Sequence, residues 1–133
     1  MAGAEVKIRV ADSEDKEKIL ELLSEIFPES AEFYNEDTYF LAERGKEAVG
    51  FGHLKEKKER AYLQGIGVKE DERGRGTGTK LIEYMLDYCD RKGFQKITLK
   101  VKAENPAVGL YLKKGFLVKK MGKSHVMVRK QPN

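Results

Sequence analysis

The residues best suited to chemistry form a short loop rich in glycine and arginine. Glycine lets the backbone approach a ligand closely and turn its N–H groups outward. An amphipathic helix is expected to start at this loop, so its unpaired N–H groups and its dipole would face the same ligand. Such a loop is typical of a phosphate site, and two arginines would add bidentate donors. Its residues are Arg73, Gly74, Arg75, Gly76, Thr77, Gly78 and Thr79.

Other interpretations of this loop fit less well. A dinucleotide fingerprint needs G-x-G-x-x-G and an acid about twenty residues on, whereas these glycines are spaced G-x-G-x-G. A Walker loop needs Gly-Lys-Ser/Thr, but Gly78 is followed by Thr79 and then Lys80. A solvated basic turn, or an arginine–glycine contact to nucleic acid, stays open on the loop alone.

The elements around the loop predict one mixed α/β domain spanning residues 1–133. Strands are expected at Val6–Val10, 38–43, 47–55, 60–68, 97–101, 116–120 and 126–129, from alternating or continuous apolar runs. Helices are expected at 19–27, from the end of the loop at Gly78 to the stop at Gly93, and at 105–114, with a short one at 30–35. Because a helix joins strand 60–68 to strand 97–101, these two should be parallel, beside an antiparallel meander.

Two motifs together resemble the GNAT acetyltransferase superfamily. Arg73-x-x-Gly76-x-Gly78 is similar to the family's pyrophosphate loop, and Ile66-Gly67-Val68 occupies the place of the strand before it. About thirty residues on, a second segment is similar to the family's N-x-x-A-x-x-L-Y-x-x-x-G-F. It departs at the small residue, because Gly109 precedes Leu110 and Ala107 lies one or two positions from the usual alanine. The matching residues there are Asn105, Leu110, Tyr111, Gly115 and Phe116.

The resemblance implies a fold, a cosubstrate and a set of binding residues. The fold is a mostly antiparallel sheet with one parallel pair splayed around the coenzyme A site and helices on both faces. Backbone N–H groups of residues 73–79 would hold the pyrophosphate of acetyl-CoA. Ile66, Gly67 and Val68 would pair with the pantetheine arm, and the Asn105 side chain would reach the pantetheine or the acetyl end.

Tyr111 is the one catalytic residue that the resemblance suggests. When an amine attacks the thioester, the leaving group is a thiolate with a reference pKa of about 8.5, against about 10 for tyrosine, so a proton could pass between them. Without the motif around it, an aromatic side chain on a short helix is more simply a core residue. A general base is harder to find, because strand 60–68 holds no acid. Glu59, Glu36, His53 and a water chain remain candidates.

The function that this sequence predicts is acetyl transfer from acetyl-CoA to a primary amine of unknown identity. The alternative is a domain that binds or senses acyl-CoA without turnover, and a nucleic-acid-binding domain ranks last. No 18-residue apolar window or N-terminal signal pattern is present, and neither histidine has metal-ligand spacing. A single cysteine, Cys89, suits a reducing cytoplasm. We therefore expect no membrane or metal partner, and leave a homodimer open.

Overall fold

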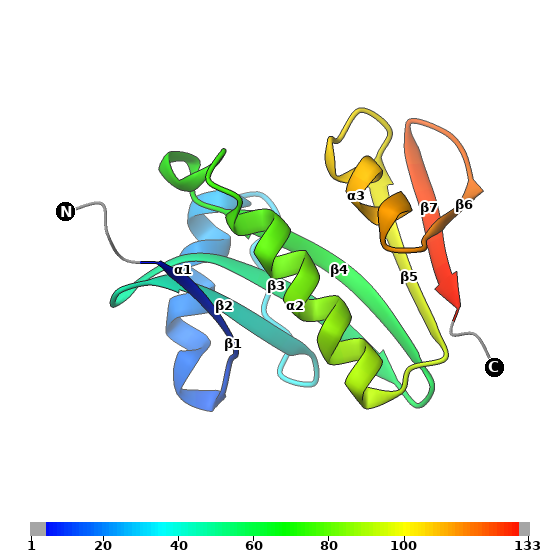
Figure 1. Cartoon of the computed structure of the whole chain (residues 1–133). Helices are drawn as coiled ribbons and strands as arrows, with labels where there is room; N and C mark the ends of the chain where they lie inside the picture. Colours follow the sequence, from blue (N-terminus) through cyan, green and yellow to red (C-terminus); the bar gives the residue numbers. More distant parts are fainter. Residues whose placement is uncertain (1–4, 131–133) are drawn as a thin grey trace.

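Seven strands form one mixed sheet in the order β1-β2-β3-β4-β5-β7-β6 (Figure 1). The computed structural model describes residues 5–130, so the predictions about residues 1–4 and 131–133 lie outside it. The strands are β1 Val6–Val10, β2 Thr38–Arg44, β3 Glu47–Lys57, β4 Arg60–Val68, β5 Lys96–Lys102, β6 Leu117–Lys120 and β7 Ser124–Lys130. The helices are α1 Lys16–Ile26, α2 Thr77–Lys92 and α3 Ala107–Lys113, with 3₁₀ turns η1 Ser13–Asp15 and η2 Glu70–Glu72.

Helices cover both faces of the sheet because β2 is apolar on both sides. Phe40 and Ala42 belong to the core that α2 closes, whereas Tyr39 and Leu41 belong to the core beneath α1. Successive side chains of a strand point to opposite faces, so a continuous apolar run buries both. In Figure 1, α2 crosses one face of the sheet and α1 lies on the other. The mixed α/β fold with helices on both faces is therefore confirmed.

The predicted helix at residues 30–35 is wrong. This segment has no regular structure, because its aromatic side chains hold it against β2. The Phe33 ring stacks on Tyr39 with centroids 4.7 Å apart, and the Tyr34 N–H donates to the Tyr39 hydroxyl at 3.1 Å. The Tyr34 amide is thus bonded to a side chain instead of a helical carbonyl.

The parallel pair separates halfway along β4. β4 pairs with β5 only from Arg60 to Leu63, and from Lys96 to Leu99 on the partner strand. At that point β4 shifts register against β3, because His53 pairs with Gly65 while Leu54 pairs with Leu63. Gln64 is therefore an extra residue, and such a bulge bends its strand. The bend leaves the second half of β4 unpaired on its β5 side.

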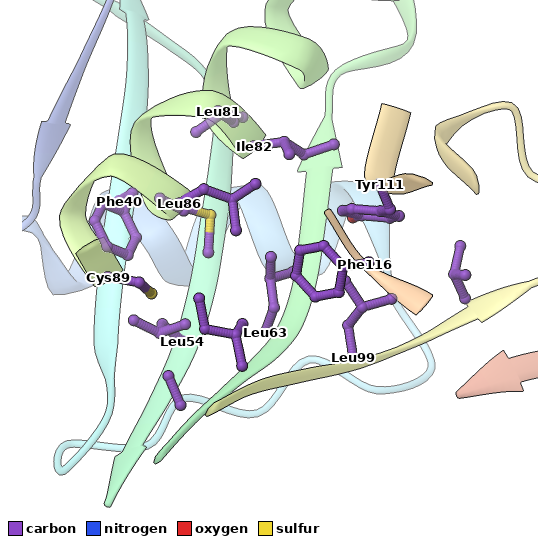
Figure 2. Packing of buried hydrophobic residues seen from close by; sticks show 14 of the residues in the cluster. Phe40, Leu54, Leu63, Leu81, Ile82, Leu86, Cys89, Leu99, Tyr111 and Phe116 are labelled. Carbon is purple, nitrogen blue, oxygen red and sulfur yellow. The ribbon is translucent and has the colours of Figure 1, made fainter. Parts of the chain in front are cut away.

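The larger core fills the space between the sheet, α2 and α3. In Figure 2, side chains of α2, among them Leu81 and Leu86, lie in the same cluster as Leu63 of β4. The α3 side of this core is formed by Tyr111 and Phe116, whose rings meet edge to face with centroids 5.5 Å apart. These contacts fix α3 at the point where the parallel strands diverge.

Candidate functional site

A cleft of about 1120 Å³ opens where β4 and β5 diverge. Its walls are the second halves of the two strands, the loop after β4, the first turn of α2, and α3. Of the residues that the sequence predicted to bind the cofactor, Arg75 is the one that does not line it. The others, from Ile66 to Tyr111, come together around this cleft although they are up to 45 positions apart in the chain.

The glycine loop is shaped by its backbone conformation. Gly74 and Gly76 have φ angles of 79° and 84°, in the left-handed region that favours glycine. A Cβ atom on either would meet nothing within 4 Å, so conformation, rather than lack of room, selects glycine. Gly76 is the N-cap of α2, and no side chain caps the helix there. The first N–H groups of α2 therefore point out of the helix at a wall of the cleft, which suits an anion.

A buried carboxylate supports this loop, and the sequence analysis missed it. Glu72 is 4% exposed, and its Oε2 accepts from the Arg44 guanidinium at 2.5 Å and from the Thr77 hydroxyl at 2.9 Å. The bond to Arg44 holds the pKa of Glu72 below its usual range, so this carboxylate is charged at neutral pH. The sequence signal for this carboxylate was the position of Glu72 directly before Arg73, the first arginine of the basic loop.

The two arginines of the loop are used differently. Arg73 lines the cleft, and its Nε donates a 3.4 Å hydrogen bond to the carbonyl oxygen of Val68. Arg75 faces Glu72 instead, with Nη1 3.5 Å from Oε1. Arg73 is therefore the arginine available to a ligand in the cleft, whereas Arg75 helps to neutralise the buried carboxylate.

Tyr111 projects from α3 toward the cleft with its ring in the core. It is 5% exposed, and burial raises the pKa of its hydroxyl to about 12. Burial is the single cause of this raised pKa, and within residues 5–130 no protein group forms a hydrogen bond with the hydroxyl. The ring thus has the packing of a core residue, while the hydroxyl is a protonated donor that borders the cleft.

Asn105 borders the cleft but already has a structural task. Its Oδ1 accepts a 2.8 Å hydrogen bond from the Ala107 N–H, in the first turn of α3. Asparagine is a preferred residue for satisfying helix N-termini in this way. Its Nδ2 group is the part left for a ligand.

None of the three side chains considered as general base lines the cleft. Glu59 lies in the turn before β4, at the end where β4 and β5 still pair. Glu36 lies exposed in the segment before β2. His53 is buried against the Tyr39 ring, its Nε2 lies 2.6 Å from Asp37 Oδ2, and burial lowers its pKa.

The structure also bears on a metal site, a membrane-spanning helix and the reactivity of the cysteine. Across residues 5–130, no three His, Cys, Asp or Glu side chains are grouped so as to hold a metal ion. No helix in the same range is both long and apolar enough to pass through a membrane. Cys89 is buried on α2, where burial raises the pKa of its thiol to about 12, so it is an unreactive thiol.

Sequence comparison decides the family. The acetyltransferase (GNAT) family model matches residues 8–116. This chain belongs to the GNAT family. A mycothiol acetyltransferase of Corynebacterium glutamicum is 34% identical over 104 residues, which is 77% of this chain and 35% of the relative. An uncharacterized N-acetyltransferase of Methanocaldococcus jannaschii is 33% identical over 105 residues, 73% of this chain and 46% of that one. This GNAT chain thus spans a third to a half of these relatives.

Solved structures agree on the GNAT fold. The ribosomal-protein-S18-alanine N-acetyltransferase of Escherichia coli superposes with a TM-score of 0.81 at 18% identity, covering 95% of this chain and 94% of that one. The PaiA N-acetyltransferase of Thermoplasma acidophilum, solved with coenzyme A, superposes with a TM-score of 0.74 at 19% identity, covering 96% of this chain and 99% of that one. At such identities the likeness concerns the fold alone.

Proposed function

We propose that this protein is an acetyl-CoA-dependent N-acetyltransferase that moves the acetyl group directly to a primary amine. The observation that carries the proposal is the cleft between the diverging strands β4 and β5. At one end it has an uncapped helix N-terminus with a glycine loop, which suits the pyrophosphate of the cosubstrate. Toward α3 it has the hydroxyl of Tyr111, which forms no hydrogen bond with any residue from 5 to 130.

Each part of the cosubstrate has a counterpart in this cleft. Ile66, Gly67 and Val68 have backbone groups on the side of β4 that β5 leaves unpaired, and an extended pantetheine arm would bond to them as an added strand does. Arg73 and the first turn of α2 would bind the pyrophosphate. The thioester would then lie toward Tyr111 and Asn105.

The names of the relatives support transfer to an amine without choosing one. They include mycothiol acetyltransferases and an L-2,4-diaminobutyric acid acetyltransferase of Nocardia farcinica, which is 37% identical over 73 residues. A neighbour solved with coenzyme A supports the cosubstrate. We propose a cytoplasmic location, which one buried free cysteine supports. We also propose that residues 1–133 form a single domain, which the single seven-stranded sheet supports.

The test is a coenzyme A release assay against a panel of amines, with calorimetry of acetyl-CoA binding. The panel holds amino acids, polyamines, and peptides with a free N-terminus or a lysine. Acetyl-CoA binding with acceptor-dependent thiol release supports the enzyme. Binding without release for any amine favours the acyl-CoA-sensing alternative, and absence of binding removes both.

A further inference from the structure

The positive charge of the chain is concentrated in its last third. Residues 91–133 contain 12 Lys or Arg and one Asp or Glu, whereas residues 1–90 contain 14 Lys or Arg and 21 Asp or Glu. This last third forms β5, α3, β6 and β7, on one side of the molecule (Figure 1). A mildly positive net charge of +4 therefore conceals one strongly basic side, which includes the β5 wall of the cleft.

One face of these strands is not covered by a helix. Ile97, Leu99 and Val101 of β5 point into the core beneath α2, so the residues between them point to the opposite face. On that opposite face, α1 packs against β3 and β4. Within residues 5–130, no helix lies over β5, β7 and β6 there (Figure 1).

Lysines occupy this uncovered face in register. Lys96 of β5 pairs with Lys130 of β7, and Lys100 pairs with Val126, which in turn pairs with Lys120 of β6. We call this surface the basic face; it consists of Lys96, Lys100, Lys102, Lys120 and Lys130, together with Lys119, which lies at the bulge between Val118 and Lys120 and whose charge acts on Lys96. Within the described chain, none of the six forms an ion pair, whereas lysines elsewhere, such as Lys18 and Lys69, do.

The lysines of the basic face repel one another. The pKa of Lys96 lies below its usual range. The largest cause is the charge of Lys119, followed by burial and by the charges of Lys130 and Arg60. Clustered like charges cost free energy that an anionic partner would recover. Apolar groups lie among them, since Leu117 is 73% exposed beside Val128 and Val126.

The basic face continues into the cleft. Lys100 and Lys102 belong to both, and their side chains leave β5 on the face opposite α2. Because α2 packs on the opposite face of the sheet, its first turn would serve the pyrophosphate of the cosubstrate in this proposal, and these lysines would serve the acceptor.

Resting on the proposed acetyl transfer, we propose that the acceptor amine is carried by an acidic polypeptide segment that lies extended along the basic face. Same-side residues of an extended peptide repeat about every 6.7 Å, the same spacing that separates Lys100 from Lys102 on β5. The exposed Leu117 side chain suits an apolar side chain of the peptide. A single-stranded nucleic acid would instead need several stacking rings, and within the described residues Tyr62 is the one aromatic that β4 and β5 place on this face.

The test compares acceptor peptides that differ only in flanking charge. Each carries a free N-terminus and one lysine, with either Asp/Glu, Ser/Gly or Lys flanks, and kcat/KM is followed by thiol release. We expect the acidic peptide to exceed the neutral one by at least about fivefold at about 50 mM salt, with the advantage shrinking by about 200 mM. The basic peptide should be poorest.

Variants outside the cleft connect the effect to the basic face. Lys119→Gln/Lys120→Gln should lower kcat/KM for the acidic peptide until its ratio to the value for the neutral peptide is about one. Lys7→Gln/Lys46→Gln, two exposed lysines at the far side of the sheet, should leave this ratio unchanged.

Each other outcome overturns the proposal in a different way. Thiol release without a charge preference, or a preference that survives Lys119→Gln/Lys120→Gln, removes the basic face as the acceptor surface and leaves the acetyltransferase intact. A single-stranded RNA that binds through Lys119 and Lys120, with no peptide preference, shows a nucleic-acid surface instead. Absence of release from any amine removes the proposed function itself.

Discussion

Thr77 Oγ1 donates a 2.9 Å hydrogen bond to Glu72 Oε2 across the glycine loop that lies between them. The same carboxylate accepts from Arg44 of β2, so one buried acid connects the two ends of the loop to the sheet. An acid this near to an anion site would repel the ligand if its charge were not balanced. Arg44 and Arg75 balance it, so Glu72 can act as a positioning residue for the loop.

Removing the Thr77 hydroxyl should loosen the loop. Thr77→Val keeps the shape of a side chain that is 1% exposed and removes one hydrogen bond to a charged group, a loss of about 1.5–3 kcal/mol in unfolding free energy. We also expect weaker acetyl-CoA binding. Urea unfolding and calorimetry measure the two effects. Thr79→Val, an exposed threonine of the same turn, serves as the stability control and should unfold like the wild type; equal stability of both variants would contradict the role of this hydrogen bond.

Charge at Gly76 should abolish cosubstrate binding. Gly76→Asp puts a carboxylate at the N-cap of α2, where the pyrophosphate is proposed to bind, and Asp tolerates the left-handed conformation better than most residues. We expect a folded protein without measurable acetyl-CoA affinity by calorimetry. Gly76→Asn has nearly the same shape without the charge and should keep part of the affinity. If Asp and Asn bind alike, the electrostatic argument fails.

The two loop arginines should differ in effect. Arg73→Ala removes a guanidinium that lines the cleft, and a well-formed charge-assisted hydrogen bond contributes about 1.5–3 kcal/mol, which is about 10- to 150-fold in the acetyl-CoA dissociation constant. Arg75→Ala should weaken binding only a few-fold, because Arg75 faces Glu72. Calorimetry with both variants decides this, and a larger loss at Arg75 would reverse the assignment.

The fold was largely predictable because its signals are local. The bounds of β4 agree residue for residue with the prediction, since a turn and a loop mark both ends of an apolar run. The segment at 30–35 was not predictable in this way, because contacts with Tyr39 on another element decide its conformation.

The resemblance carried by two motifs also pointed to residues that line the cleft, from Ile66 to Tyr111. It could not find the pairing of Glu72 with Arg44, which are 28 positions apart. Nor could it separate the roles of Arg73 and Arg75, because both sit in the same basic loop and only the folded chain turns Arg75 toward the buried acid.

Two glycines of β4 should respond differently to a methyl group. A Cβ at Gly67 would lie 2.6 Å from Cε1 of Phe51, which belongs to the core beneath α1, and 3.0 Å from Cε2 of Phe27, which is exposed at its edge. At Gly65, also on the cleft, nothing lies within 4 Å. Gly67→Ala should therefore cost about 1–3 kcal/mol of unfolding free energy through overpacking, and Gly65→Ala little. Denaturant unfolding tests this, and equal stability would mean that the two rings move aside freely.

Tyr111 is the residue whose role divides catalysis from packing. Its hydroxyl, with a pKa of about 12, is protonated at neutral pH, as a donor must be. Yet that pKa lies well above the reference value of about 8.5 for a thiol, so complete proton transfer to the thiolate is uphill. Donating a hydrogen bond to the sulfur as its negative charge develops costs less free energy than transferring the proton completely. Below about pH 11 the rate should therefore show no loss from ionisation of Tyr111.

Tyr111→Phe keeps the ring against Phe116 and removes only that donor. If the hydroxyl stabilises the leaving thiolate, kcat should fall by about 10²-fold or more, while acetyl-CoA affinity and the melting temperature change little. If Tyr111 only fills the core, Phe should be silent. Whichever role is correct, Tyr111→Ala should lower the free energy of unfolding by about 3–5 kcal/mol. Single-turnover kinetics on wild type and both variants, with a melting curve for each, separate the two roles. A Phe variant with full activity, under conditions where chemistry limits the rate, would leave the thiolate to be protonated by water.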